Sequence, residues 1–176
     1  MDELNNINNN ILEFKSLSIN DVNQIHEFSS NKDASKYIGW NLKTTLEDTE
    51  KLINTLLKNE ANKTHIYASV YLKNTDILIG TAMIFNIDKT AKHAEIGYVL
   101  HQDFWHNGYG TEMISMLSDF CFNILKINKI YANVVEPNIG SQCILIKNNF
   151  TLEAELKEHF YIDNQYHSCL IFSKKA

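Results

Sequence analysis

The residues with the clearest chemical potential lie in a short polar turn between an apolar strand pattern and a helical pattern. The turn consists of Asn107, Gly108, Tyr109, Gly110 and Thr111, between the apolar run 96–100 and a helical spacing of apolar residues over 113–120. The first N–H groups of a helix have no partner within the helix and lie at the positive end of its dipole, so they favour a bound anion. Glycine lets the backbone approach that anion closely. The spacing therefore predicts a phosphate-binding turn.

Two well-known phosphate-binding motifs are excluded at this turn. A P-loop needs Gly-Lys followed by Ser or Thr at the helix start, and a dinucleotide-binding fingerprint needs a third glycine near the start of a domain. Neither pattern is present, and the turn follows several strands, past mid-chain. An ordinary strand-to-helix turn without a ligand remains the alternative.

Length and composition indicate one domain. The 176 residues include one proline and six glycines, with no stretch that resembles an interdomain linker, and a chain of this length can bury a full core. We expect the Asn-rich residues 1–10 to form a disordered or loosely packed tail and residues 11–176 to form the domain. The formal net charge of −5 argues against nucleic-acid binding and suits a cationic acceptor.

The cysteines and histidines give no indication of a metal site. The three cysteines form no Cys-x-x-Cys pair, and no His-Glu-x-x-His motif is present. The N-terminus lacks the features of a signal peptide, and no apolar run reaches membrane-spanning length. We therefore expect a cytoplasmic protein with no metal and no membrane partner.

Hydrophobic periodicity predicts the α+β class, with the order β, α, α, β, β, β, α, β, α, β, β. In chain order these segments cover about 11–17, 20–29, 44–59, 66–72, 77–87, 92–100, 109–125, 130–135, 141–148, 152–160 and 166–172. Residues 66–100 read as an antiparallel meander. The expected architecture is a mixed, mostly antiparallel central sheet flanked by helices.

The element order and the turn together resemble the GCN5-related N-acetyltransferases (GNAT), and within them the branch that acetylates the N-termini of ribosomal proteins. The resemblance extends from Ile11 to Ser173. The family's acetyl-CoA signature, Gln/Arg-x-x-Gly-x-Gly/Ala, is matched by Trp105, His106, Asn107, Gly108, Tyr109 and Gly110. Trp at the first position is usual in the ribosomal-protein branch, whereas His106 and Asn107 replace a Gly-Lys pair. The resemblance implies acetyl-CoA as co-substrate, with its phosphates at residues 105–111.

A second stretch, residues 138–150, resembles the family pattern Asn-x-x-Ser followed by Glu-Lys-x-Gly-Phe. The resemblance implies that Asn138 and Ser141 approach the pantetheine and its sulfur. Taken alone, both residues are typical of helix capping after Pro137. Asn149 stands where the family has glycine, and asparagine is the second choice for the left-handed backbone that this position requires.

The resemblance also implies a sparse set of catalytic groups. The backbone N–H near Leu100 would stabilise the thioester carbonyl as charge develops on it. Many members carry a tyrosine acid at the position of Leu145, so Ser141 is here the expected hydrogen-bond donor or proton relay, as is usual in the ribosomal-protein branch. Glu95 lies where some members carry a catalytic base, and an interstrand polar pair is its alternative role.

The acceptor amine decides how strong a base is needed. At pH 7, neutralising an α-amine with a pKa near 8 costs about 1.4 kcal/mol, whereas a lysine with a pKa near 10.4 costs about 4.6 kcal/mol. The sparse set of acids and bases therefore favours an N-terminal acceptor, such as that of a ribosomal protein.

Other acceptors and roles stay open at this stage. They are a small amine (a polyamine, an amino acid or an aminoglycoside) and a non-catalytic acyl-CoA-binding module. His106 is a candidate phosphate contact, and Tyr37, Trp40 and Tyr161 are candidates to line the acceptor side, with ordinary packing as the alternative for each. The resemblance allows a monomer or a homodimer.

Overall fold

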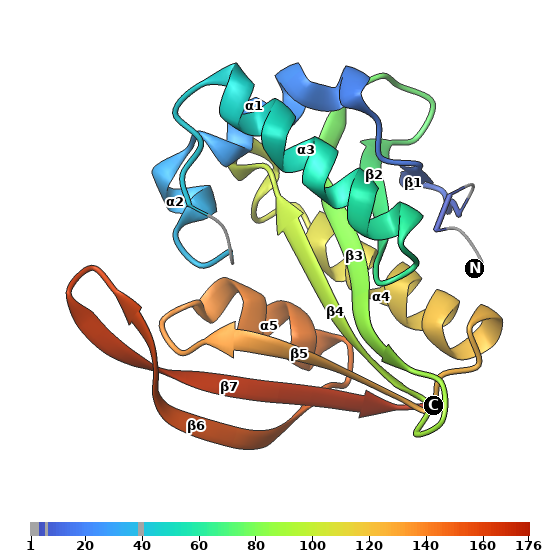
Figure 1. Ribbon diagram of the computed structural model, residues 1–176. Helices are drawn as coiled ribbons and strands as arrows, with labels where there is room; N and C mark the ends of the chain where they lie inside the picture. The colour runs from blue at the N-terminus through green and yellow to red at the C-terminus, as the bar shows by residue number, and fades with distance from the viewer. Residues whose placement is uncertain (1–3, 6, 39–40) are drawn as a thin grey trace.

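The computed structural model describes residues 4–5, 7–38 and 41–176, and it has the α+β architecture that the sequence predicts (Figure 1). The strands in this part of the chain are β1 (Leu12–Lys15), β2 (Ile66–Leu72), β3 (Leu78–Asp88), β4 (His93–Leu100), β5 (Lys129–Val135), β6 (Thr151–Ile162) and β7 (Gln165–Lys175). The α-helices are α1 (Val22–Ser29), α2 (Lys32–Ser35), α3 (Leu46–Ala61), α4 (Tyr109–Asp119) and α5 (Ile139–Lys147). The strands form one sheet in the order β1-β2-β3-β4-β5-β7-β6.

The sheet has a helical layer on each face (Figure 1). On one face, apolar residues of α4 and α5, among them Met113, Leu117 and Leu145, pack against the inward side chains of the central strands. On the other face, α1 and α3 contribute Phe28 and Ile53 to a second cluster. Both layers follow from the alternation of strand side chains between the two faces.

The sheet opens in the middle. All neighbouring strands are antiparallel except β4 and β5, which pair in parallel at only three positions, His93–Glu95 with Lys129–Tyr131, among the described residues. Beyond these pairs β4 continues to Leu100 and β5 to Val135, and in Figure 1 the two strands diverge. The divergence leaves a wedge between the half-sheet β1–β4 and the half-sheet β5–β7.

The predicted elements are all present, with three additions among the described residues. One is a 3₁₀-helix over Gln102–Phe104, between β4 and α4. Another is α2, a single helical turn after α1, whose N-cap Asn31 accepts hydrogen bonds from two backbone N–H groups through its side chain. The helix expected over 109–125 is regular only to Asp119 and continues as a π-helix over Phe120–Ile124. None of these additions has enough residues to establish a period of its own.

Part of the Asn-rich N-terminal segment packs against the domain, although we expected a disordered or loosely packed tail. Leu4 is buried, and Asn8 forms an isolated β-bridge with Glu13. Asn9 donates a hydrogen bond from Nδ2 to the carboxylate of Glu112 at 2.9 Å. None of the described helices is long and apolar enough to span a membrane.

Candidate active site

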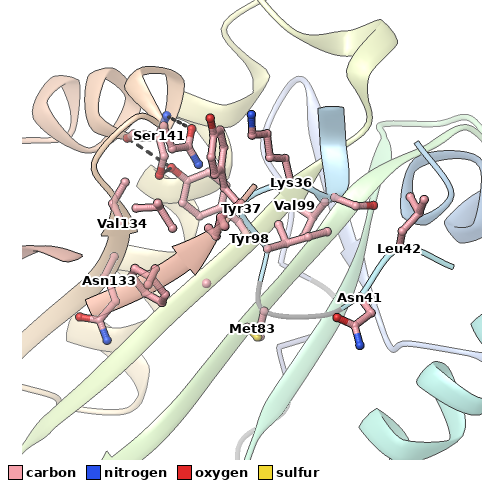
Figure 2. Close-up of a pocket in the computed structure, with 18 of the residues that line it drawn as sticks. Lys36, Tyr37, Asn41, Leu42, Met83, Tyr98, Val99, Asn133, Val134 and Ser141 are labelled. Atoms are coloured by element: carbon pink, nitrogen blue, oxygen red, sulfur yellow. Dashed lines mark hydrogen bonds between the residues drawn. The ribbon is translucent and has the colours of Figure 1, made fainter. Parts of the chain in front are cut away.

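The wedge between β4 and β5 contains a cavity of about 1040 Å³. Side chains alternate along β4, so Tyr98 points toward the layer of α4 and α5 whereas Val99 packs into the layer of α1 and α3. In Figure 2, Asn133 and Val134 of β5 lie on one side of the cleft, and Met83 and Val99 lie on the other. The cleft is therefore lined from both faces of the sheet.

The predicted anion-binding turn lies at the N-terminus of α4, immediately after β4. Gly108 is the N-cap of α4 and has a φ of 84°, a left-handed backbone that glycine adopts without strain. None of the described side chains caps this helix start. A Cβ built on Gly108 would have no described atom within 4 Å, so the turn is open to an approaching anion. These features fit a bound pyrophosphate.

Neighbouring residues fix the shape of this turn. Trp105 donates from Nε1 to the carbonyl of Leu100 at 2.9 Å, and Asn107 donates from Nδ2 to the carbonyl of Trp105 at 2.8 Å. His106 adopts a positive φ of 63° and is exposed. The backbone N–H of Thr111 donates to the carbonyl of Gly108 at 3.0 Å. The segment therefore connects the end of β4 to α4 in a fixed path.

Gly110 is required for close packing between α4 and α5. A Cβ at this position would lie 2.6 Å from Cδ1 of Ile144 on α5. On the same interface, Asn148 donates from Nδ2 to the carbonyls of Thr111 and Ile144 at 3.1 and 3.0 Å. The short helix α5 is thus packed directly against the first turn of α4.

The structure brings Ser141 and Asn138 to the same cleft. Asn138 is the N-cap of α5 and accepts a hydrogen bond from the backbone N–H of Ser141 at 3.2 Å, so the capping role considered from the sequence is present. Asn149, after the end of α5, has a φ of 64°, which confirms the left-handed backbone predicted for it. Leu145 is fully buried in the core.

Tyr98 is a site residue that the sequence did not reveal. Its hydroxyl lies 2.8 Å from Oγ of Ser141, as the dashed lines in Figure 2 indicate, and 3.4 Å from the Ser141 carbonyl oxygen. Burial raises the pKa of Tyr98 to about 12, while the hydrogen bond with Ser141 offsets part of that rise. In the sequence, Tyr98 is one aromatic residue in a strand and carries no motif.

Glu95 lies buried at the last pair of β4 with β5, opposite Tyr131. Its two carboxylate oxygens accept hydrogen bonds from Asn86 Nδ2 at 2.8 Å and Asn133 Nδ2 at 2.9 Å. Burial raises the pKa of Glu95, and the hydrogen bonds from Asn86, Asn133 and Tyr131 lower it by less. Glu95 therefore joins β3, β4 and β5 at the vertex of the wedge and also lines the cleft.

His101 has a packing role rather than an open position at the site. It is buried between the rings of Phe28 and Phe104. Its Nδ1 accepts from the backbone N–H of Asp103 at 3.2 Å, and its Nε2 lies 3.3 Å from a carboxylate oxygen of Glu27. Across the described ranges, no three His, Cys, Asp or Glu side chains are grouped so that they could hold a metal ion.

The side of the cleft near α2 is formed by Tyr37, Tyr161 and an ion pair. Lys36 Nζ lies 2.9 Å from the carboxylate of Asp163, in the turn between β6 and β7. This pair raises the pKa of Lys36 and lowers that of Asp163. Trp40, the third aromatic residue that we expected on this side, lies outside the described residues.

Comparisons with known proteins agree with this arrangement. A model of the acetyltransferase (GNAT) domain family matches residues 12–151. Over 153 residues the chain is 27% identical to the uncharacterized N-acetyltransferase YoaA of Bacillus subtilis (strain 168), with 87% of this chain and 86% of YoaA covered. Over 152 residues it is 30% identical to the uncharacterized N-acetyltransferase p20 of Bacillus licheniformis, with 84% and 83% covered.

Two further proteins are similar to the chain and have named acceptors. The spermidine N(1)-acetyltransferase of Vibrio cholerae serotype O1 is 24% identical over 158 residues, with 90% of this chain and 89% of that protein covered. The structure of RimL, a ribosomal-protein α-N-acetyltransferase in complex with coenzyme A, superposes with a TM-score of 0.84 at 20% identity, with 95% of each chain covered. At 20% identity, the similarity to RimL shows a shared fold.

The chain therefore belongs to the GNAT acetyltransferase family. It is an acetyl-CoA-dependent N-acetyltransferase. The open turn at Gly108 and the wedge between β4 and β5 fit acetyl-CoA as co-substrate.

Proposed function

We propose that this enzyme acetylates the α-amino group of a protein N-terminus, as ribosomal-protein acetyltransferases do. The observation that carries the proposal is the charge of the cleft. Its lining contains the lysines Lys32 and Lys36 beside the carboxylates Asp33, Glu95 and Asp163. Lys36 already pairs with Asp163, so the described residues of the lining include no cluster of acidic side chains that would suit a polycation. A polyamine carries several positive charges and is recognised best by several carboxylates.

The cleft has few ionisable groups that could act as a base, which suits an α-amine as the acceptor because it loses its proton easily. An acceptor with a pKa near 8 loses its proton at a cost of about 1.4 kcal/mol at pH 7, whereas a lysine side chain costs about 4.6 kcal/mol. Glu95 is the one buried carboxylate in the lining of the described cleft, and both of its oxygens accept amide hydrogen bonds. We propose that Glu95 receives the amine proton, directly or through water. A weak base of this kind suffices for an α-amine.

The remaining residues hold and polarise the donor. We propose that the turn of residues 105–111, with backbone N–H groups at the start of α4, binds the phosphates and that Asn138 borders the pantetheine path. The backbone N–H near Leu100 would stabilise negative charge on the thioester oxygen. Ser141 would donate a hydrogen bond to the departing sulfur. Acetyl-CoA supplies an activated acyl group, and these residues supply orientation and charge stabilisation.

Polyamine acetylation is the second candidate, because a spermidine N(1)-acetyltransferase is among the relatives and Asp33 and Glu95 lie in the same lining.

The proposal also includes a cytoplasmic setting, supported by the fact that Cys121, Cys143 and Cys169 are all unpaired. The chain would act as a monomer or a homodimer.

The test is thiol release from acetyl-CoA with matched acceptors. One peptide would begin with a free Ala or Ser, a second would have the same sequence with a blocked N-terminus and one internal lysine, and spermidine and an aminoglycoside would complete the set. We expect turnover with the free N-terminus and none with the blocked peptide. Faster turnover with spermidine than with any peptide would contradict the proposal.

The same assay tests the two catalytic residues. Ser141→Ala and Glu95→Gln are each expected to lower kcat by about a hundredfold or more with the preferred acceptor, within the range typical of acid–base groups. Binding of acetyl-CoA, measured by calorimetry, should change little because neither side chain lies in the phosphate turn. An unchanged kcat in Glu95→Gln would leave Glu95 with only its interstrand role.

A further inference from the structure

The hydroxyl of Ser141 is held by a partner on a different element. Ser141 lies in the first turn of α5, and its backbone N–H is already fixed by Asn138. Its side-chain oxygen lies 2.8 Å from the hydroxyl of Tyr98, which comes from β4 on the other side of the wedge. The two hydroxyl groups therefore join the two diverging walls of the cleft.

Either hydroxyl could donate in this contact, and the relative acidity of the two groups favours Tyr98 as the donor. A serine hydroxyl has one proton and two lone pairs, and a phenol is the more acidic of the two groups and hence the better donor. A second acceptor near Tyr98 among the described residues, the carbonyl oxygen of Ser141, is 3.4 Å away, which is long for an O–H···O hydrogen bond. Donation from Tyr98 to Ser141 Oγ leaves the proton of Ser141 directed elsewhere, into the cleft.

We propose that Tyr98 is a positioning residue that acts through Ser141, by orienting the serine hydroxyl so that its proton is available to the departing sulfur. This inference rests on the proposed role of Ser141 in acetyl transfer. Tyr98 keeps its own proton throughout, in agreement with the high pKa that burial gives it. At the position of Leu145, where a hydroxyl acid would otherwise stand, the side chain is apolar and buried.

The proton balance of the transfer does not require ionisation of Tyr98. An N–C bond forms and the C–S bond breaks with its electron pair on sulfur. The nitrogen loses one proton to Glu95, and the released thiolate takes up one proton from water, so Ser141 and Tyr98 keep their own protons. Glu95 lies on the side where the amine proton leaves in the proposed function, and Ser141 stabilises the negative charge on the sulfur. Tyr98 contributes only the direction of the Ser141 hydrogen bond.

A double-mutant cycle tests this dependence. Tyr98→Phe is expected to lower kcat about five- to tenfold, the loss of roughly one hydrogen bond, and to leave KM for acetyl-CoA unchanged. Ser141→Ala should lower kcat by about a hundredfold. Because Tyr98 acts through Ser141, adding Tyr98→Phe to Ser141→Ala should cause no further loss. Two multiplying defects, or no defect in Tyr98→Phe, would overturn the proposal.

Tyr67→Phe is the matched control. Tyr67 is another buried tyrosine, on β2 and outside the cleft lining, and its hydroxyl interacts with Asn59. Its loss is expected to lower the melting temperature somewhat and to leave kcat unchanged. A purely structural tyrosine would lose activity only to the extent that its melting temperature falls. If Tyr98→Phe behaves in this way, Tyr98 has no positioning role.

A second readout does not depend on the acceptor. The thiol pKa of bound coenzyme A can be followed by thiolate absorbance, and a hydrogen-bond donor near sulfur lowers it. Ser141→Ala should raise that thiol pKa, Tyr98→Phe should raise it by a smaller amount, and the double variant should match Ser141→Ala. If no peptide is acetylated but these shifts appear, the proposed acceptor fails and the role of Tyr98 stands. If Ser141→Ala shifts the thiol pKa and Tyr98→Phe does not, the role of Tyr98 is wrong; if neither variant shifts it, the roles of both residues fail together.

Discussion

Glu95 combines burial, charge and an interstrand position in one residue. Both of its carboxylate oxygens accept amide hydrogen bonds, yet burial outweighs them and raises its pKa. A carboxyl group whose pKa is higher in the folded than in the unfolded state binds its proton more tightly in the folded state. The stability that Glu95 contributes is therefore greatest below the ordinary carboxyl pKa of about 4.5 and decreases as the pH rises through the raised value.

The decrease of this stability with rising pH can be tested with Glu95→Gln. Glutamine has no ionisation in this range, so the difference in the free energy of unfolding between wild type and variant isolates the titration of Glu95. We expect that difference to favour the wild type more at pH 4 than at pH 7. Urea unfolding at several pH values between 4 and 8 measures it. A difference that instead grows as the pH rises would mean that the amides of Asn86 and Asn133 lower the pKa of Glu95.

The sequence could point to Glu95 and Ser141 but not to their partners. Both residues stand at motif positions that can be read along the chain. Tyr98 is 43 positions from Ser141, and Asn133 is 38 positions from Glu95. These contacts form only when β4 and β5 pair at three positions and then diverge, and no local pattern encodes where that pairing stops.

At the scale of the elements, the packing of α5 on the first turn of α4 controls the shape of the phosphate turn. Gly110 permits the approach, since a Cβ there would lie 2.6 Å from Cδ1 of Ile144. Asn148 strengthens it through hydrogen bonds to carbonyl oxygens of both helices. The atom that a Cβ at position 110 would contact, Cδ1 of Ile144, is the end of a flexible side chain. The contact can therefore be avoided by glycine at position 110 or by a shorter side chain at position 144.

We therefore expect Gly110→Ala and Ile144→Val to be coupled. Alanine adds about 1 kcal/mol of helix propensity, but the contact with Ile144 costs about 1–3 kcal/mol. Ile144→Val removes the contacting methyl group, so the double variant should be more stable than the sum of the single changes by about 1–2 kcal/mol. Denaturant unfolding of the four proteins measures the coupling. Simple additivity would show that α4 and α5 shift apart without strain.

The elements themselves were the most predictable feature of the chain. Segments of seven or more residues with a clear period, such as β2 and α3, lie close to their expected positions. The turn α2 was not predicted because four residues are too few to show a helical period. The π-helix after Asp119 has the same apolar content as a continued α-helix, so the pattern could not separate the two.

At the scale of the whole molecule, two half-sheets meet at the vertex of a wedge and are tied again across its mouth. Near the vertex, β4 and β5 share three residue pairs, closed by the polar contacts of Glu95. At the acceptor side, Lys36 next to α2 pairs with Asp163 in the turn between β6 and β7. The N-terminal helices and the C-terminal hairpin therefore both contribute to the entrance of the cleft.

The exposed pair of Lys36 and Asp163 is expected to affect acceptor binding rather than stability. Its side chains are 40% and 70% exposed, and solvent screening leaves such pairs with little effect on the free energy of unfolding. Asp163→Asn should thus leave the melting temperature unchanged. It should raise KM for the acceptor several-fold at low salt, because α2 and the hairpin are no longer held together, and the effect should shrink as ionic strength screens the wild-type pair.

Exchanging the two charges distinguishes the effect of the ion pair from the effect of each charge alone. The exchange Lys36→Asp with Asp163→Lys restores an ion pair of opposite polarity across the same entrance. If the entrance depends on the pairing, KM in the exchanged protein returns toward the wild-type value, while each single reversal, which opposes two like charges, raises KM further than Asp163→Asn. If instead KM follows the sign of the charge at position 36, Lys36 contacts the acceptor itself. Steady-state kinetics with the preferred peptide at two salt concentrations distinguishes the two results.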